Sequence, residues 1–330
     1  MSNPMPLVSI VTPVYNGATY LSECIESVLA QTYTNWEYVI ANNCSTDSTL
    51  AIAQRYAEMD RRIRVCDFRE FVDVIESHNR AVRLISSQSK YCKVVSADDC
   101  LFPECIARMV ELAETHPSVG IVGAYIVWGG GKNWRVSLDG LHYQTSVVPG
   151  REACRWHLLG QRQYFGNPTA SMYRSDLVKS TEDFYPNLRE NADISAMYKH
   201  LQASDFGFVH QVLAYMRVHE DALSAEARRL SIYQGSHLLD VLHYGPVYLT
   251  APELENRLDK VLREYYALLA KGVLSLKGKK FWRYHRAILD EYGAPLFGRK
   301  MAISTCGQLL ACFLNLQDTG KKILKRLKAD

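Results

Sequence analysis

Residues 91–103 read Y-C-K-V-V-S-A-D-D-C-L-F-P, a short apolar run that stops at two adjacent carboxylates. The apolar run predicts a buried strand, and Pro103 is typical of the first turn of a following helix. In an open α/β sheet, ligands bind beyond the carboxyl ends of the strands, so we expect Asp98 and Asp99 at the mouth of a binding site. Neighbouring carboxylates repel each other, and a divalent cation is the usual means of keeping both ionised. On the dipeptide alone, a cap on the following helix explains the pair equally well.

Strand and helix patterns alternate on both sides of this stretch. They predict strands over 8–12, 36–41, 63–66, 119–128 and 208–215, and helices over 21–29, 50–56, 74–84, 103–115 and 193–202. Residues 132–165 are predicted to be irregular with one short helix near 152–159, and the glycines at 129–131 favour a turn over a mobile lid. The alternation predicts an α/β fold, with a mostly parallel sheet and helices on both faces.

The composition is that of a globular protein. The 330 residues suit one full domain with an appendage, and 48% hydrophobic with 22% charged residues gives no sign of disorder. Nine cysteines are scattered without a C-x-x-C pair, which argues against a disulfide framework or a zinc site and favours a reducing cytoplasm. The N-terminus lacks a basic secretory region, and no window approaches the roughly 18 apolar residues of a spanning helix.

Charge is distributed unevenly along the chain. Residues 225–330 contain 18 Lys and Arg against 10 Asp and Glu, whereas residues 1–224 contain 20 against 25. From Ala225 onward the pattern changes to helices rich in Leu, Tyr and basic residues. The sequence therefore predicts a boundary near residue 225, with a helical extension over 225–330.

The basic C-terminal third allows two interpretations. A basic aromatic cluster lies at 279–286, and residues 321–328 read K-K-I-L-K-R-L-K. One interpretation is peripheral contact with an anionic membrane, which is favoured for the last ten residues. The other is packing on the rest of the chain or in a homodimer, which is favoured for the middle helices. No RNA- or DNA-binding motif accompanies the charge, so we expect no nucleic-acid partner.

Motifs follow three predicted strands in a fixed order. The first strand leads into P-V-Y-N-G at 13–17, the second ends in I-A-N-N-C-S-T-D at 40–47, and the third motif is S-A-D-D at 96–99. Together these stretches resemble the family 2 glycosyltransferases, enzymes with the GT-A fold, over roughly residues 5–225. The resemblance implies a Rossmann-like sheet, with a nucleotide-sugar-binding half over 1–100 and an acceptor-binding half over 101–224.

The resemblance also implies an activity. A metal-dependent, inverting hexosyl- or related transferase would move a sugar from a nucleotide-diphospho-sugar to a hydroxyl of a saccharide or lipid-linked acceptor in surface polysaccharide synthesis. UDP-sugars are the favoured donors, and we expect the protein in the cytoplasm, with the inner face of the cell membrane as the site of any lipid contact.

Residue assignments follow from the same resemblance. The residues that it assigns to donor binding are Pro13, Tyr15, Asn16, Asn42, Asp47, Asn79, Arg80, Asp98 and Arg217. Within this set, Tyr15 is expected against the base and Asn42 at the base edge, where the family usually has Asp. The residues that it assigns to a Mn²⁺ or Mg²⁺ ion are Asp98, Asp99 and His219. Asp193 corresponds to the general base for the acceptor hydroxyl, with Glu190 as the runner-up.

Two other functions remain as alternatives. Asn42, Ser96 and Asn191 stand where acids are common in the family, which motivates a non-catalytic protein of the same fold that binds sugar nucleotides or serves as a scaffold. A nucleotide-binding oxidoreductase is disfavoured, because no G-x-G-x-x-G follows the first strand.

Overall fold

The computed structural model describes residues 5–130, 133–187, 191–219 and 223–314. The chain divides into two compact units, Met1–Ala225 and Glu226–Asp330. The strands of the first unit are β1 (Val8–Val14), β2 (Trp36–Asn42), β3 (Ile63–Asp67), β4 (Tyr91–Val94), β5 (Cys100–Leu101), β6 (Val119–Gly130), β7 (Asn133–Ser137), β8 (Val147–Val148), β9 (Ser171–Arg174) and β10 (Asp205–Arg217). Its helices are α1 (Leu21–Leu29), α2 (Thr49–Met59), α3 (Val74–Val82), α4 (Cys105–Thr115), α5 (Gly150–Leu158), the 3₁₀ turn η1 (Pro168–Ala170), α6 (Ser175–Lys179) and α7 (Ala192–His200).

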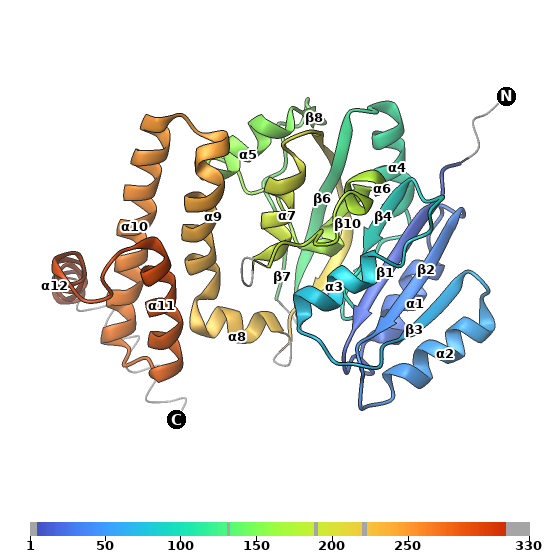
Figure 1. Ribbon diagram of the computed structural model, residues 1–330, viewed down its shortest axis with the longest axis horizontal. Helices are drawn as coiled ribbons and strands as arrows, with labels where there is room; N and C mark the ends of the chain where they lie inside the picture. Colours follow the sequence, from blue (N-terminus) through green and yellow to red (C-terminus); the bar gives the residue numbers. More distant parts are fainter. Residues whose placement is uncertain (1–4, 131–132, 188–190, 220–222, 315–330) are drawn as a thin grey trace. The chain divides into compact units, whose positions relative to one another are not determined.

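The described strands form one sheet in the order β3-β2-β1-β4-β9-β6-β10-β5, with β7 paired to β6 and β8 paired to β10 (Figure 1). Strands β1 to β4, β6 and β10 run in one direction, and β5, β7, β8 and β9 run against it. The predicted α/β fold with a mostly parallel sheet is therefore confirmed. The parallel direction brings the carboxyl ends of β1, β2 and β4 to one edge of the sheet.

Helices cover both faces of the sheet, and successive side chains of each strand point to one face and then to the other. Val8 and Ile10 of β1 belong to a core that they share with apolar residues of α1, α2 and α4. Between them, Ser9 points to the opposite face, where it donates to Glu37 and accepts a hydrogen bond from the N–H of Ser86. Ser86 follows α3, which packs against β1 and β2. The helix α3 therefore covers the face opposite to α1, α2 and α4.

An aromatic cluster packs around β9 and β10. Tyr173 of β9 meets Phe184 edge-on at 5.0 Å, and Phe206 of β10 stacks on Tyr164 at 5.3 Å. Phe165 contacts Phe206 as well, and all five rings are buried. Aromatic rings bury the most apolar surface per residue, so they hold the chain before and after η1 in place.

The predicted irregular stretch over 132–165 is wrong at its start. Residues Asn133–Ser137 form β7, which pairs with β6, and β6 itself continues through Gly129 and Gly130. A Cβ at Gly129 would lie 2.1 Å from the carbonyl oxygen of Asn133, so this close pairing requires glycine. The stretch N-W-R-V-S alternates polar and apolar residues, but its side chains are mostly exposed and it directly follows the glycine run that predicted a turn. Residues 131–132 of the predicted turn lie outside the described residues.

The second unit is helical. It contains most of α8 (Leu223–Leu230) and all of α9 (Ile232–Tyr248), α10 (Ala251–Leu274), α11 (Lys279–Tyr292) and α12 (Arg299–Leu314). A capping box joins Thr250 and Glu253 at the start of α10. His285 of α11 is buried and hydrogen-bonds the Tyr265 hydroxyl of α10 at 2.5 Å. Among the described residues, no helix has the length and apolar content needed to cross a membrane.

Candidate active site

Two loops beyond the carboxyl ends of β1 and β2 are bound to each other. Asn16 accepts a hydrogen bond from the N–H of Thr46 at 2.8 Å, and Asp47 accepts one from the N–H of Ala18 at 3.1 Å. Asn16 has a left-handed φ of 51°, which asparagine tolerates better than most residues. Pro13 is buried at the end of β1. Asn16 and Asp47 are exposed, and their hydrogen bonds shape the two loops.

The rim of these loops contains two aromatic rings and a carboxylate. Tyr15 is 49% exposed, and its ring meets that of Phe71 at 4.8 Å. Asn42 is buried, and its side-chain amide donates to Asp67 at 2.7 Å and accepts weakly from the N–H of Ser45 at 3.4 Å. Asp67 ends β3 and is exposed. Position 42 is thus an asparagine, and a carboxylate lies beside it at Asp67 on the neighbouring strand β3.

Asn79 and Arg80 of α3 have different surroundings. Asn79 is buried, and it exchanges two hydrogen bonds of 3.0 and 2.8 Å with the backbone of Tyr185. Arg80 pairs with Glu76 at 3.1 Å and lies over the ring of Phe68 at 5.6 Å. Phe68 follows β3, and its N–H donates to the carbonyl oxygen of Asn42 at the end of β2. Arg80 therefore lies near the ends of β2 and β3, whereas Asn79 is bonded to the more distant segment at Tyr185.

Asp99 is fixed by three donors inside the protein. Its Oδ2 accepts from the Thr169 hydroxyl at 2.6 Å and from the Asn167 amide at 3.2 Å, and its Oδ1 accepts from the N–H of Arg217 at 3.1 Å. The residue is 1% exposed. Burial and the neighbouring charge of Asp98 raise the pKa of Asp99 despite these donors. Asp99 is thus an internal carboxylate that lies behind Asp98.

The backbone at Thr169 is held in place by a buried lysine. The ammonium group of Lys93, fully buried in β4, donates to the backbone carbonyls of Thr169 and Ser171. The Thr169 hydroxyl also accepts from the N–H of Ser96 at 3.0 Å. A buried lysine needs such acceptors, because an unpaired buried charge is costly. The η1 turn is therefore locked to the end of β4.

Asp98 and His219 form the exposed side of this centre. His219 Nε2 lies 3.0 Å from Asp98 Oδ2, and the imidazole packs against the ring of Tyr20 at 4.8 Å. The buried Nδ1 of His219 has no hydrogen-bond partner among the described residues. The described residues hold no group of three or more metal-ligating side chains. Mg²⁺ and Mn²⁺ are commonly held by one or two protein groups together with substrate phosphates, so Asp98 and His219 fit such an ion.

Arg217 connects the carboxylates to the start of α1. Its Nε donates to the backbone carbonyl of Asp98 at 3.1 Å, and one terminal nitrogen contacts Glu23 at 2.5 Å. The guanidinium lies over the ring of Tyr20 at 4.4 Å. These contacts place an arginine beside Asp98, and a guanidinium is a group that can bind an anion.

Asp193 lies at the start of α7. Its Oδ1 accepts from the N–H of Ile194 at 2.9 Å. Burial raises the pKa of Asp193 to about 6, which the backbone donor opposes. No hydrogen bond or ion pair with another described residue joins Asp193 to Asp98 or Asp99, so its part in the site stays a prediction. Glu190, the alternative base, lies outside the described residues.

Several residues of the site were not found from the sequence. They are Tyr20, Glu23, Asp67, Phe71, Lys93 and Thr169. Thr169 directly follows Gly166-Asn167-Pro168, residues that are typical of a turn, and this was the one available signal. The others have common residue types in ordinary helix, strand and loop patterns, and only the fold brings them to the carboxylates or to the loop rim.

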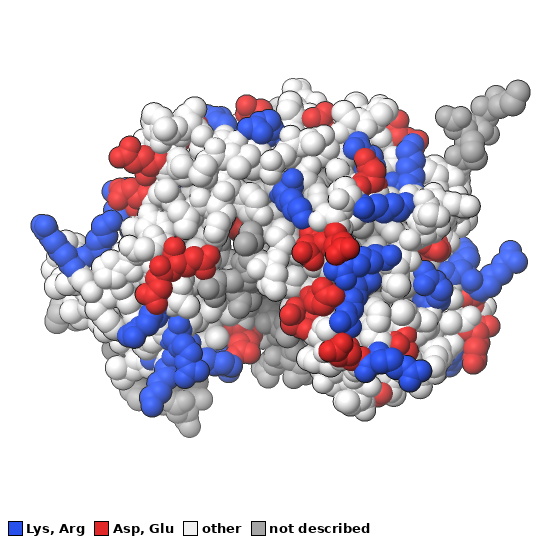
Figure 2. All heavy atoms as spheres, in the orientation of Figure 1, with Lys and Arg blue, Asp and Glu red and all other residues white. Residues whose placement is uncertain are grey.

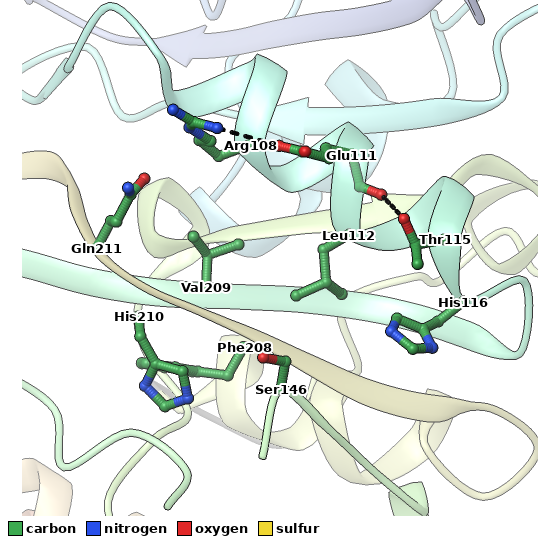
Figure 3. A pocket seen from close by; sticks show the side chains of 10 residues that line it. All are labelled: Arg108, Glu111, Leu112, Thr115, His116, Ser146, Phe208, Val209, His210 and Gln211. Carbon is green, nitrogen blue, oxygen red and sulfur yellow. Dashed lines mark hydrogen bonds and ion pairs between the residues drawn. The ribbon is translucent and has the colours of Figure 1, made fainter. Parts of the chain in front are cut away.

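A hollow of about 390 Å³ lies elsewhere, against the side of α4 (Figure 3). Its lining includes Leu112 of α4, His116 directly after α4, and Phe208, Val209 and His210 of β10. A bulge interrupts the pairing of β10 with β6 beside Val209. None of the predicted site residues lines this hollow, so it is separate from the site built at Asp98.

Comparison with known proteins agrees with this geometry. A model of glycosyl transferase family 2 matches residues 9–181. An uncharacterized glycosyltransferase of Rickettsia typhi is 29% identical over 220 residues, which is 65% of this chain and 65% of that protein. The putative teichuronic acid biosynthesis glycosyltransferase TuaG of Bacillus subtilis is 37% identical over 99 residues, 30% of this chain and 38% of TuaG. The chain thus spans less than two thirds of the length of each of these two relatives.

Solved structures show the same fold. TarS 1–349 of Staphylococcus aureus, in complex with UDP-GlcNAc, has a TM-score of 0.63 at 16% identity, over 87% of this chain and 80% of that one. The mannosyltransferase PcManGT of Pyrobaculum calidifontis, in complex with GDP-Man and Mn²⁺, has a TM-score of 0.52 at 16% identity, over 92% and 88%. The family model covers more than half of the sequence, and its motifs meet at one edge of the sheet, so the chain belongs to glycosyl transferase family 2.

Proposed function

We propose that the protein transfers a sugar from a nucleotide-diphospho-sugar to a hydroxyl of a saccharide or lipid-linked acceptor in surface polysaccharide synthesis. The observation that carries the proposal is the cluster of Asp98, His219 and Arg217 beside the two loops at the carboxyl ends of β1 and β2. In this cluster, the Asp98 carboxylate and the His219 imidazole would bind a cation, and the Arg217 guanidinium would bind the diphosphate. The relative TuaG, named for teichuronic acid biosynthesis, supports a surface glycan as product.

UDP-sugars are the favoured donors. Tyr15 and Phe71 offer exposed rings to a base, and Asp67 offers a carboxylate that Asn42 orients through its amide. Uracil has an N–H that can donate a hydrogen bond to such a carboxylate. Asp67 would therefore supply the acceptor that the family usually takes from the position of Asn42. Replacement Asp67→Asn should weaken UDP binding and leave Mn²⁺ binding unchanged.

A Mn²⁺ or Mg²⁺ ion would be held by Asp98 and His219. When bound, the ion neutralises charge that builds on the leaving diphosphate. The protein's own groups do the remaining work. Arg217 offers its guanidinium to the phosphate oxygens, and Asp99 orients the chain at Asp98 through its bonds to Thr169 and Arg217. Tyr20 packs against both His219 and Arg217 and limits their motion.

Asp193 would accept the proton of the acceptor hydroxyl. The acceptor oxygen forms a bond to the anomeric carbon from one side while the bond to the diphosphate breaks on the other, so the configuration is inverted. The raised pKa of Asp193, about 6, leaves it ionised at neutral pH and a stronger base than an exposed carboxylate. A single carboxylate suffices for this one-step displacement.

Transfer itself provides the test. The wild type and Asp193→Asn would be incubated with UDP-sugars, Mn²⁺ and saccharide acceptors, and product configuration would be read by proton NMR. We expect an inverted product from the wild type and donor binding without transfer from the variant. Donor binding without transfer in both proteins would favour the alternative, a binding or scaffold protein of the same fold.

The wider assignments belong to the same proposal. Residues 1–224 would be the catalytic domain, with donor binding over 1–100 and acceptor binding over 101–224, and residues 225–330 its helical extension. The protein would act on the cytoplasmic side of the cell membrane. Whether the extension also forms a homodimer can be read from the mass of the protein in solution.

A further inference from the structure

The turn between α10 and α11 exposes aliphatic side chains. Leu276 is 90% exposed, and its backbone has a left-handed φ of 50°. That conformation is unfavourable for a bulky apolar residue, and Gly or Asn would adopt it with less strain. Val273 and Leu274, in the last turn of α10, are 36% and 39% exposed. We call these three residues the aliphatic tip, and packing within the helical unit does not account for its exposure.

Cations surround the aliphatic tip. Residues 271–286 contain six Lys or Arg and no Asp or Glu. Lys279, Arg283 and Arg286 are exposed and recur at i, i+4 and i+7, so they form one stripe along α11. Lys280 pairs with Glu226, whereas Lys279 and Arg283 make no ion pair with a described residue. Figure 2 shows Lys and Arg side chains gathered over this end of α10 and α11.

A hollow adjoins the aliphatic tip. It has a volume of about 450 Å³, and its lining includes Arg229, Lys277, Lys280 and Leu276. Three cationic side chains thus stand beside an exposed leucine. At an anionic bilayer, the lipid phosphates would contact such cations, and the leucine side chain would insert among the acyl chains.

We propose that the α10–α11 turn docks on an anionic lipid bilayer, with Leu276 at the boundary between headgroups and acyl chains. The charge is complementary to anionic lipid, and the exposed aliphatic side chains gain by leaving water. Nucleic acid would engage the cations but would leave Val273, Leu274 and Leu276 exposed, so the bilayer is the favoured partner. The inference does not depend on the transfer reaction, because none of the residues placed at the donor or acceptor site belongs to this turn.

The test is sedimentation of the full chain with phosphatidylcholine vesicles, with and without phosphatidylglycerol. We expect binding to the anionic vesicles alone, weakened by salt. Each cation near an anionic surface contributes on the order of fivefold in affinity, so Lys279→Gln with Arg283→Gln should weaken binding by more than tenfold. The control pair Arg61→Gln with Lys260→Gln removes the same charge from exposed positions outside the turn and should leave binding unchanged.

Leu276→Asn separates docking from a structural role. Asn tolerates the left-handed backbone better than Leu, so the melting temperature should stay the same or rise while vesicle binding weakens by about tenfold. Wild-type vesicle binding in both Leu276→Asn and the Lys279→Gln, Arg283→Gln double variant would overturn the proposal. Failure of the full chain to sediment with anionic vesicles at low salt would also overturn it. A weaker binding of these two variants to an RNA homopolymer, with unchanged binding to vesicles, would overturn it as well. Sugar transfer to a soluble saccharide tests the proposed function independently of vesicle binding.

Discussion

Thr169→Val removes one hydrogen bond from Asp99 with little change of shape. The hydroxyl donates to the carboxylate at 2.6 Å, and the two residues are 0% and 1% exposed. A hydrogen bond to a charged group contributes about 1.5–3 kcal/mol, and a neutral one about 1 kcal/mol. The loss should therefore depend on whether Asp99 is ionised.

The sign of the pH dependence follows from burial. Burial and Asp98 raise the pKa of Asp99 in the metal-free folded protein to about 7, whereas an Asp in the unfolded chain titrates near about 3.9. The folded state keeps this proton after the unfolded chain has released it. The stabilisation from Asp99 is thus complete in acid and is lost as the pH rises toward 7. Thr169→Val should cost about 1–2 kcal/mol more at pH 8 than at pH 5, in addition to the loss, equal at both pH values, of the hydrogen bond from the N–H of Ser96.

Denaturant unfolding of the metal-free protein at the two pH values measures this difference. Thr12→Val is a matched control, because Thr12 is equally buried and bonds the neutral phenol of Tyr38 at 2.8 Å. It should cost about 1 kcal/mol at both pH values. In a separate titration followed by the paramagnetic resonance of free Mn²⁺, Thr169→Val should bind the ion at least about tenfold more weakly. Equal losses at both pH values, with unchanged Mn²⁺ affinity, would refute the reasoning and leave Thr169 a packing residue.

Three further substitutions test other parts of the site. Asp193→Asn should stabilise the protein above pH 6, because the raised pKa means that burial of the ionised form is unfavourable, and a lower melting temperature at pH 8 would contradict this. Tyr15→Ala should weaken donor binding by about 1–3 kcal/mol in calorimetry with little effect on stability, since the ring is 49% exposed; an unchanged donor affinity would remove Tyr15 from the base site. His219→Gln should abolish the Mn²⁺ dependence of donor binding, and full dependence in this variant would exclude His219 as a ligand.

The sequence predicted the elements whose pattern is set by the sheet. Strands β1, β2 and β4 read as buried apolar runs because both of their faces are covered, and the loops after them were found from the order of their motifs. β7 was missed although N-W-R-V-S alternates polar and apolar residues, because the strand is only five residues long and follows the glycines that predicted a turn. A short alternating run beside a turn signal does not by itself specify a strand.

The chemistry within the site was less accessible to sequence reasoning. Asp98 and Asp99 are adjacent and of one residue type, yet they have different surroundings. The Asp98 side chain faces His219, whereas the Asp99 side chain is buried and bonded to Thr169. Burial, which decides this division, depends on η1, about seventy positions further along the chain. The carboxylate of Asp67 likewise meets Asn42 only because β2 and β3 pair in register, which no local pattern specifies.

The most direct test of the account is the thermal stability of the full chain with UDP-, dTDP-, GDP- and CMP-sugars, with and without Mn²⁺. A ligand at about a hundred times its Kd stabilises the folded state by about 2.7 kcal/mol, so a true donor stands out clearly. We predict a rise in melting temperature with a UDP-sugar that requires Mn²⁺ and is lost in Asp98→Ala. No rise with any sugar nucleotide, or a rise that Asp98→Ala retains in full, would contradict the assignment of the site.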